Sequence, residues 1–561
     1  MKFLIKVIET PATKVVGETS FRLIFNYNKE LIEVLHRIGN CIWLKAEKVW
    51  EMPINKLAEF IDNAALIDDI EVTLMEDAPA ETVQLLCNYK TKPYSYQEQG
   101  IKWIIEKHNG LLLDEPGLGK TIQLIYAAEE LKKQKGAQHC LIICGINSLK
   151  TNWRNEIKKH SNESCVIIGE RINSKGKVTY ATIKERAEQL KEPIEQFFVI
   201  MNCEMLVDPI VVDAIKNSKN KFDIIAIDEA HKVAGPTSTR GKNLLKLASV
   251  GDYHIAMTGT LIMNSPIDSF IPLKFIGANK STLTSYKQMY CVMDQRWHNQ
   301  VIGYKNLDLL KNEIDGHSLR RLKSEVLDLP PKTIIKECIE MEPEHRKLYD
   351  DLVQGISEEF DLVHIDTSAL LGLVIRERQA TACPGLLSSK DVPPSKLLRA
   401  VDLAEEIIST GNKVVIFSQF KAPVEYLMEH LAKYGAVCAT GDTSVQDTDN
   451  AKDRFQNDPN CKVFIGTLDK IGTGFTLTAA SYEIFIDQPW TAAVDGQCED
   501  RCYRIGTSKP LTIYKLICTG TIDERVFNKV AEKKDLADYL VDDIVNNRET
   551  LLNLLGVDNT N

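Results

Sequence analysis

The strongest constraint on the fold is a set of six short apolar runs between residues 110 and 260, separated by stretches with helical spacing. They are GLLLD, HCLIICG, CVIIG, FFVIMN, FDIIAID and YHIAMTG. Runs that are apolar throughout are typical of parallel strands covered on both faces. Five further runs, KVVIFS, AVCAT, KVFIGT, YEIFID and LTIYKLI, follow from residue 413. Strand–helix alternation in both sets predicts an α/β chain with two doubly wound lobes.

The first 85 residues have a different pattern from the rest of the chain. FRLIFNYN is typical of a strand and KELIEVLHRI of a helix, and they are followed by a hairpin in CIWLKAEKVWEMP and a helix in INKLAEFIDNAAL. This order predicts a small α+β module ahead of the two lobes. The predicted domains are the module at 1–85, lobe one at 92–330, a helical connection at 331–395, lobe two at 396–540 and an acidic tail at 541–561.

The composition argues against a membrane protein and leaves a nucleic-acid partner possible. No run approaches the ~18 apolar residues of a membrane span, and MKFLIKVIET is too short and too rich in lysine for a signal peptide. Fourteen cysteines without a C-x-x-C pair favour reduced thiols in a cytoplasmic or nuclear compartment. Of the net charge of −10, residues 51–90 carry −7 and residues 521–561 carry −4. The remaining body is nearly neutral and can still present a basic groove to phosphates.

A candidate phosphate-binding loop, DEPGLGKT, lies between the apolar run GLLLD and a helical stretch. It departs from the general pattern G-x-x-x-x-G-K-[ST] at its first position, which is Asp114. Gly117 and Gly119 would let the backbone curl around phosphate oxygens. Lys120 would place a cation at the β- and γ-phosphates, and Thr121 a hydroxyl on Mg²⁺. The alternative is a glycine-rich turn that binds no ligand.

The sequence DEAH follows the apolar run FDIIA, 108 residues after Lys120. Asp228 at the end of a strand could hold Mg²⁺, partly through water, and Glu229 beside it could polarise an attacking water. A capped helix start is the alternative for DEAH taken alone. Its place after a glycine–lysine loop in a parallel sheet favours the catalytic interpretation.

Two arginines in QCEDRCYRIG, Arg501 and Arg504, are three residues apart and would share one face of a helix. Two guanidinium groups directed across a cleft could neutralise charge that develops on a γ-phosphate. The alternative is a surface helix whose arginines pair with Glu499 and Asp500. A site divided between two lobes would let hydrolysis change how tightly the lobes close.

Taken together, residues 92–535 resemble the Swi/Snf-type family of ATP-dependent DNA translocases within helicase superfamily two. DEPGLGKT is similar to the phosphate loop of that family, which also begins with Asp rather than Gly. LRRLKSEVLDLPPK at 319–332 is similar to a segment specific to the family. The other matching segments, in order, are YQEQGIKW, LIICGINSLKTNWRNEI, DEAH, MTGTLIMNSP, VVIFSQF, GTGFTLTAA, and QCEDRCYRIG followed by GTIDERV.

The resemblance implies two RecA-like lobes, ATP and Mg²⁺ as cofactors, and movement along duplex DNA without strand separation. It implies that Gln97 reads adenine and that Gly474 and Gln497 also contact the nucleotide. It further implies a DNA track across both lobes, with candidate contacts at Asn152, Thr258, Thr260, Ser418 and Gln419. Such contacts would position the motor without reading sequence. Capping of turns is the alternative role for each hydroxyl.

Five residues depart from the pattern of this family, and none of them removes a catalytic group. They are Pro116 in place of methionine, Gly145 and Leu261 in place of proline, Thr476 in place of asparagine, and Thr507 in place of glutamine. Thr476 leaves a phosphate or inter-lobe contact of its motif in question.

The first 85 residues resemble the HARP module found ahead of the motor in annealing helicases. FNYNKELIEVLHRI and IWLKAEKVWEMPINKLAEFI carry this resemblance, with Trp43 and Trp50 in the predicted hairpin. It implies that the module directs the motor to junctions between single- and double-stranded DNA. An exposed tryptophan could stack on an unpaired base, worth ~1–3 kcal/mol. The alternative places both tryptophans in the core of a small domain.

The sequence therefore predicts a monomeric, DNA-dependent ATPase that translocates on double-stranded DNA and remodels or reanneals forks. Three alternatives stay open: a strand-separating helicase, a motor that displaces a DNA-bound protein, and a scaffold that uses ATP as a clamp. The expected location is the cytoplasm of a bacterial or phage-infected cell, or the nucleus in a eukaryote.

Overall fold

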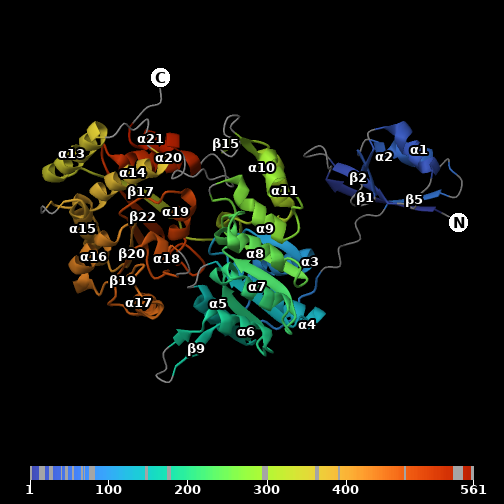
Figure 1. Cartoon of the computed structure of the whole chain (residues 1–561), viewed down its shortest axis with the longest axis horizontal. Coiled ribbons are helices and arrows are strands. Elements are labelled where there is room, and N and C mark those ends of the chain that lie inside the picture. Colours follow the sequence, from blue (N-terminus) through green and yellow to red (C-terminus); the bar gives the residue numbers. More distant parts are fainter. Residues whose placement is uncertain are drawn as a thin grey trace. The chain divides into compact units, whose positions relative to one another are not determined.

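The computed structural model describes residues 3–11, 19–24, 29–39, 41–44, 49–53, 56–64, 67, 70–74, 83–145, 149–173, 178–263, 265–293, 301–359, 366–388, 392–472, 476–534 and 548–556. The chain divides into two compact units, Met1–Gln84 and Leu85–Asn561. Figure 1 labels most of their helices and some of their strands. Within the described residues, none of the helices has both the length and the apolar character that crossing a membrane requires.

The first unit contains a five-stranded sheet in the order β3-β4-β2-β1-β5. Its elements are β1 (Phe3–Pro11), β2 (Thr19–Ile24), α1 (Lys29–Ile38), β3 (Ile42–Leu44), β4 (Val49–Pro53), α2 (Leu57–Ala64) and β5 (Ile70–Leu74). The predicted strand, helix, hairpin and helix are confirmed, whereas β1 and β5 were not predicted. Leu31 and Leu35 of α1, Phe60 of α2 and Met52 of β4 are fully buried and form the core of this unit.

The second unit begins with a seven-stranded sheet in the order β16-β6-β13-β12-β7-β11-β8, whose pairs are all parallel. Its strands are β6 (Asn109–Leu112), β7 (His139–Cys144), β8 (Cys165–Ile167), β11 (Phe198–Asn202), β12 (Phe222–Asp228), β13 (Tyr253–Met257) and β16 (Ser318–Leu319). All six predicted apolar runs are strands here. Most of their side chains are buried, as expected for a sheet covered on both faces; the exceptions include Cys165 and Val166 of β8.

Helices and two small hairpins complete this part, which we call lobe one. The helices are α3 (Ser95–Lys107), α4 (Lys120–Lys135), α5 (Leu149–His160), α6 (Ile183–Lys191), α7 (Pro209–Lys216), α8 (Thr239–Leu247), α9 (Phe270–Phe275), α10 (Leu283–Tyr290), α11 (Leu307–Gly316) and α12 (Lys323–Val326). The hairpins are β9 (Glu170–Ile172) with β10 (Val178–Tyr180), and β14 (Cys291–Met293) with β15 (Val301–Tyr304).

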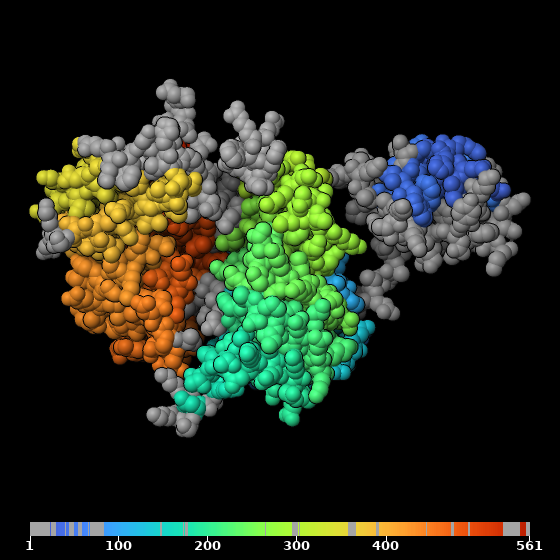
Figure 2. Space-filling model, viewed as in Figure 1, coloured from blue at the N-terminus to red at the C-terminus, as the bar shows by residue number. Residues whose placement is uncertain are grey.

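Lobe two is built on a six-stranded parallel sheet in the order β17-β22-β21-β18-β20-β19. Its strands are β17 (Lys332–Ile339), β18 (Val414–Ser418), β19 (Val437–Ala439), β20 (Val463–Thr467), β21 (Tyr482–Phe485) and β22 (Leu511–Cys518). Its helices are α13 (Pro343–Glu359), α14 (Thr367–Ala382), α15 (Ser395–Ser409), α16 (Lys421–His430), α17 (Val445–Asn457), α18 (Leu468–Ile471), α19 (Ala492–Glu499), α20 (Ile522–Lys534) and α21 (Arg548–Leu554). In Figure 2 the surface of lobe two runs from yellow to red. The predicted α/β class with two doubly wound lobes is confirmed.

The structure differs from the sequence prediction at two places in lobe two. The segment 331–395 was expected to be helical, but it opens with β17, which pairs along its whole length with β22. The predicted acidic tail, 541–561, contains α21, whose Leu551 and Leu552 are buried in a cluster with residues of α14 and α20. The run LLNLL within a charged segment supplies that apolar face, which net charge alone did not reveal.

The segment that enters the second unit is attached to α4 by one buried carboxylate. Glu130 of α4 is fully buried and accepts hydrogen bonds from the backbone N–H groups of Leu86 at 2.9 Å and Cys87 at 2.7 Å. The hydroxyl of Tyr89 donates to the same carboxylate at 2.9 Å. The ring of Tyr89 also stacks on that of Tyr126, with 4.1 Å between the ring centroids. The attachment therefore combines three hydrogen bonds with an aromatic contact.

Candidate nucleotide site

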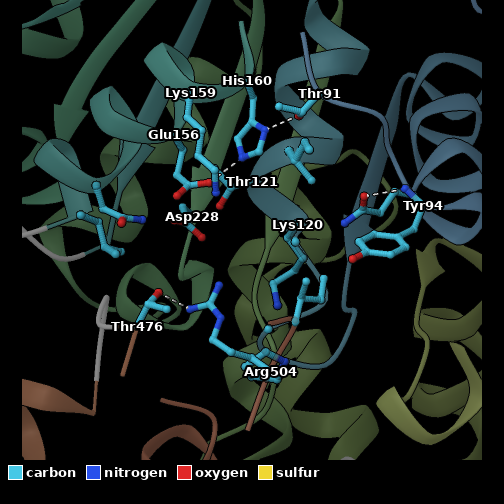
Figure 3. A pocket seen from close by; sticks show the side chains of 18 of the residues that line it. Thr91, Tyr94, Lys120, Thr121, Glu156, Lys159, His160, Asp228, Thr476 and Arg504 are labelled. Atoms are coloured by element: carbon cyan, nitrogen blue, oxygen red, sulfur yellow. Dashed lines mark hydrogen bonds and ion pairs between the residues drawn. The ribbon is translucent and has the colours of Figure 1, made fainter. Parts of the chain in front are cut away.

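A cavity of about 420 Å³ lies where the carboxyl ends of the lobe-one strands face the turn after α19 (Figure 3). It brings together most of the residues predicted to act on a nucleotide. Those present are Gln97, Gly117, Gly119, Lys120, Thr121, Asp228, Glu229, Arg501 and Arg504. Residues as far apart in the sequence as Gln97 and Arg504 thus line one site, as the two-lobe prediction requires.

The phosphate loop fills the gap between β6 and α4, and both of its inner glycines have left-handed backbones. The φ angle is 90° at Gly117 and 77° at Gly119, values that side-chain-bearing residues rarely adopt. A side-chain carbon at Gly119 would also lie 2.6 Å from Nε2 of Gln97. Gln97 is held in place because its Oε1 accepts from the Tyr94 N–H at 3.0 Å and its Nε2 donates to the Leu118 carbonyl at 3.2 Å. Its side-chain amide therefore links the start of α3 to the phosphate loop.

Asp114, the residue that departs from the general loop pattern, is fully buried and pairs with Arg321. Nε of Arg321 donates to Oδ1 of Asp114 at 2.9 Å. The amide of Gln123 donates to Oδ2 at 2.9 Å and accepts from Arg321 at 2.8 Å. The carbonyl of Asp114 accepts from Nζ of Lys120 at 2.7 Å. Asp114 is therefore an anchor for the loop, which accounts for a carboxylate where other loops carry glycine.

The DEAH carboxylates lie at the end of β12. Asp228 accepts a hydrogen bond at 2.8 Å from the indole Nε1 of Trp153, a residue that sequence reasoning did not single out. Burial, with a smaller contribution from the charge of Glu229, raises the pKa of Asp228 to about 7. A divalent cation would offset that cost, because it favours the ionised carboxylate.

Glu229 has a left-handed backbone, with φ 55° and ψ 55°, a conformation that costs free energy in a residue other than glycine. Its Oε2 is buried and accepts no hydrogen bond from the described residues, although Nδ1 of His231 lies 3.3 Å away. Burial lowers the pKa of His231, which favours a neutral imidazole beside the carboxylate. Glu229 thus retains an oxygen that can accept a proton.

Gly145, which stands where the resembled family has proline, contacts the DEAH backbone directly. Its N–H donates to the carbonyl of Asp228 at 2.8 Å. A side-chain carbon at this position would lie 2.7 Å from the carbonyl oxygen of Glu229. Proline here would lose the donated hydrogen bond and introduce a clash. The glycine is therefore matched to the unusual backbone of Glu229.

The two arginines lie in the turn after α19, not on one helical face as predicted, because α19 ends at Glu499. Arg501 is buried, and its Nε donates to the Gln497 carbonyl at 2.8 Å. Nη1 of Arg504 donates to the hydroxyl of Thr476 at 2.9 Å. Burial, together with the charge of Arg501, lowers the pKa of Arg504 to about 10, so its guanidinium remains charged at neutral pH. Both groups line the cavity opposite Lys120.

Three more of the five departures from the family pattern, besides Gly145, have a structural role. The hydroxyl oxygen of Thr476 accepts the hydrogen bond from Nη1 of Arg504, a contact within lobe two. The hydroxyl of Thr507 accepts from the N–H of Arg504 at 3.0 Å and donates to the Cys502 carbonyl at 2.6 Å. It therefore closes the turn after α19 that carries Arg501 and Arg504, which we call the arginine turn. Pro116 packs against Gly259, where an added side-chain carbon would lie 2.4 Å from its ring.

Comparison with known proteins agrees with this geometry. Residues 96–386 match the model of the SNF2-related domain, and residues 398–506 match that of the helicase conserved C-terminal domain. This chain belongs to the SNF2-related family. The first match covers lobe one and continues through β17, α13 and α14 of lobe two, and the second match lies entirely in lobe two. Together they indicate an ATP-hydrolysing enzyme.

Relatives of this SNF2-related chain include an uncharacterized ATP-dependent helicase of Mycoplasma pneumoniae, 28% identical over 92% of this chain and 48% of the relative. The human DNA annealing helicase and endonuclease ZRANB3 is 26% identical over 79% of this chain and 40% of that protein. A solved SWI2/SNF2 ATPase core of Sulfolobus solfataricus in complex with dsDNA is 25% identical, covering 81% of this chain and 94% of that one, at a TM-score of 0.38. The chain spans about half the length of the first curated relatives it matches.

One face of α5 contributes to the nucleotide cavity of this SNF2-related chain, and most of that face was missed from sequence. Asn152 was expected on the DNA side, but it lines the cavity with Glu156, Lys159 and His160. Nδ1 of His160 lies 2.5 Å from the Thr91 hydroxyl, and its Nε2 lies 3.1 Å from Glu156. Burial alone would raise the pKa of Glu156, but His160, Lys159 and Arg504 together lower it. The four-residue spacing of 152, 156 and 160 could have revealed this face.

Two residues predicted to contact the nucleotide are not among those that line this cavity. Gln497 instead lines a second cavity of about 340 Å³ between the lobes, together with Arg240 and Asp469. Gly474 lies outside the described residues.

The other four residues predicted on the DNA track divide into two kinds. Thr258 is fully buried; its hydroxyl donates to the Thr260 carbonyl at 2.9 Å and accepts from the Thr260 N–H at 3.2 Å. Ser418 is also fully buried and donates to Asp487 at 2.7 Å. Oγ of Ser418 also accepts from the N–H of Phe420 at 3.1 Å, so both hydroxyls cap turns in this structure. Thr260 and Gln419 are half-buried, and their contact with DNA stays a prediction.

The two tryptophans of the first unit differ in exposure. Trp43 on β3 and Trp50 on β4 are directly paired across the hairpin, with 5.5 Å between ring centroids. Trp43 is 45% exposed, whereas Trp50 packs against the core cluster and meets His36 edge-on at 5.6 Å. The core alternative thus fits Trp50, and the surface position predicted for a stacking residue fits Trp43.

Proposed function

We propose that this chain hydrolyses ATP at the cavity between its lobes and uses the energy to translocate on double-stranded DNA. The observation that carries the proposal is the convergence of Lys120, Asp228, Glu229 and Arg504 on one cavity from both lobes. A single-lobe binding site would have no use for a base and an arginine supplied from the other lobe.

The lobe-one residues supply binding and the base. The left-handed loop at Gly117 and Gly119 leaves room for phosphate oxygens beside Lys120. Thr121 and the buried carboxylate of Asp228 line the same cavity and are suited to hold Mg²⁺, which would neutralise phosphate charge when bound. Glu229, whose Oε2 accepts no hydrogen bond from the described residues, is suited to orient a water and take its proton.

The lobe-two residues supply charge that depends on closure of the lobes. Arg504 and Arg501 face the cavity from the turn after α19, and Thr476 fixes the direction of the Arg504 guanidinium. A cation positioned at the γ-phosphate stabilises the transition state, and its removal commonly lowers the rate by ~10³–10⁵-fold. Loss of that contact after hydrolysis would loosen one lobe from the other and so drive a step along DNA.

Steady-state ATPase and nucleotide-binding measurements on point variants test the composite site. Lys120→Ala should lose nucleotide binding, whereas Glu229→Gln and Arg504→Ala should bind and fail to turn over. Arg399→Ala is a matched control, because Arg399 pairs with Glu337 and Glu406 on the surface of lobe two. A wild-type rate in Arg504→Ala would refute the composite site.

The DNA substrate is proposed on a separate basis. The name of the relative ZRANB3, a DNA annealing helicase, supports DNA as the track. ATPase stimulation by duplex, forked and single-stranded DNA, with RNA as a control, ranks the substrates. Displacement of a triplex-forming strand without unwinding of a blunt duplex is expected of a translocase. Efficient unwinding from a single-stranded tail would instead favour a strand-separating helicase, and DNA binding without turnover would favour an ATP-gated scaffold.

We infer for residues 1–84 a role in choosing forked DNA. These residues form a compact unit of their own with an exposed Trp43, and the proposed motor residues all lie beyond them. A protein lacking residues 1–84 should keep duplex-stimulated ATPase and lose preference for forks and reannealing activity. If it prefers forks as strongly as the whole chain, only the duplex translocase remains.

A further inference from the structure

Residues 318–332 connect lobe one to lobe two and pass beside the candidate site. At the first end, β16 adds to the lobe-one sheet, where Ser318 pairs with Leu111 and Leu319 with Leu112. At the other end, β17 begins at Lys332 and pairs with β22 of lobe two. We call residues 318–332 the connecting segment. It belongs structurally to both lobes.

The first half of the connecting segment is fixed to the phosphate loop. Arg321 pairs with Asp114 as described above, and its carbonyl accepts from the N–H of Glu115 at 3.0 Å. The N–H of Lys323 donates to Oε2 of Glu115 at 2.6 Å. The backbone at Lys323 therefore moves with the loop that would hold the phosphates.

The side chain of Lys323 points instead to the arginine turn of lobe two. Its Nζ pairs with the carboxylate of Asp500 and donates to the carbonyl of Tyr503 at 2.7 Å. The hydroxyl of Tyr503 donates back to the connecting segment, at the Pro330 carbonyl, with a length of 3.0 Å. Lys323 is only 4% exposed, so these bonds are shielded from water and from salt screening.

The phosphate loop, Lys323 and the arginine turn meet at Gly117. A side-chain carbon added there would lie 2.9 Å from Cβ of Arg504 and 3.2 Å from Cε of Lys323. Lys323 is not among the residues that line the nucleotide cavity. It therefore acts on the site through its neighbours and not by contact with the nucleotide.

We propose that Lys323 is a positioning residue that holds the turn carrying Arg501 and Arg504 against the phosphate loop. Its two partners, Asp500 and Tyr503, immediately precede the two arginines in the sequence. A bond to each of them fixes the backbone positions from which the side chains of Arg501 and Arg504 extend. This inference rests on the proposed ATP hydrolysis and deepens it, because it identifies the residue that connects the phosphate loop of lobe one to the arginines of lobe two.

The experiment compares Lys323→Met with Lys323→Arg in the full-length protein. Displacement of a catalytic group by about 1 Å can cost ~10²-fold in rate. Lys323→Met should therefore lower kcat by about 10- to 100-fold, while the Kd for a fluorescent ATP analogue changes less than about 2-fold. Lys323→Arg should recover part of the rate. Lys336→Met is the control, because Lys336 pairs with Glu524 outside the site and its loss should leave kcat unchanged.

Asp500→Asn and the double variant Lys323→Met/Asp500→Asn separate positioning from stability. Each single change leaves a buried charge without its partner, so Tm should fall. The double variant removes both charges, so its Tm should return toward that of the wild type while kcat stays low. Recovery of kcat together with Tm would overturn the proposal, as would a wild-type kcat in Lys323→Met. If the unmodified protein shows no more turnover than Glu229→Gln, the proposed ATP hydrolysis itself is refuted. That outcome differs from a failure of the positioning role of Lys323, in which the unmodified protein turns over ATP.

Discussion

Replacing Asp114 with glycine would bring the phosphate loop into line with the general pattern, yet we expect it to destabilise the protein. The Asp114 carboxylate is fully buried, and the Arg321 side chain is 10% exposed. Removal of one partner of a buried ion pair costs about 3–5 kcal/mol, because the other charge remains uncompensated. For a lobe of roughly 150–250 residues, each kcal/mol lowers Tm by about 2–4 °C. The first thermal transition of Asp114→Gly should therefore fall by about 6–20 °C.

Differential scanning calorimetry without nucleotide measures this change. The double variant Asp114→Gly/Arg321→Met should unfold at a higher temperature than Asp114→Gly alone, since it leaves no unpaired guanidinium. Asp252→Ala is the control, because that side chain is 69% exposed and its loss should change stability by less than about 0.5 kcal/mol. A Tm for Asp114→Gly equal to that of the control would refute the anchoring role.

Three further predictions follow from other parts of the structure. Gly145→Pro should lower Tm and weaken nucleotide binding in equilibrium titrations. It removes the hydrogen bond to the Asp228 carbonyl and clashes with the carbonyl oxygen of Glu229. Unchanged binding would contradict this expectation. In EDTA, Asp228→Asn should be more stable than wild type. In the folded wild type the pKa of Asp228 is raised to about 7, so the stability contributed by the protonated carboxyl is lost as pH rises. The Tm of Asp228→Asn minus that of the wild type should therefore grow from about pH 4 to 7 and then level off. A difference that is constant with pH would show that Asp228 does not titrate in this range. Trp43→Ala should lower fork affinity by ~1–3 kcal/mol with Tm unchanged, whereas Trp50→Ala should unfold the first unit, at a cost approaching ~3–5 kcal/mol; the reverse pattern in fork binding and circular dichroism would exchange their roles.

Local patterns in the sequence were sufficient for most strands and for the phosphate loop and DEAH residues, because those features are encoded within a few consecutive residues. Contacts between distant segments were not accessible in this way. Arg321 and Asp114 are 207 residues apart, and the residues around each of them give no local pattern that predicts the pairing. Asn152 was assigned to the DNA side because its motif is associated with DNA. The four-residue spacing of 152, 156 and 160 puts these residues on one face of α5, but only the packing of α5 in the fold directs that face to the cavity. The end of α19 before Arg501 is likewise fixed by tertiary packing and not by helix propensity.

The attachment of residues 86–89 to Glu130 has a mechanical consequence. Glu130 lies ten residues along α4 from Lys120, which is about 15 Å of continuous helix. Tension applied to the chain at Gln84 would therefore be transmitted to Lys120 through a continuous helix and not through a flexible linker. A load on residues 1–84 would then alter how firmly Lys120 is held, in proportion to the force.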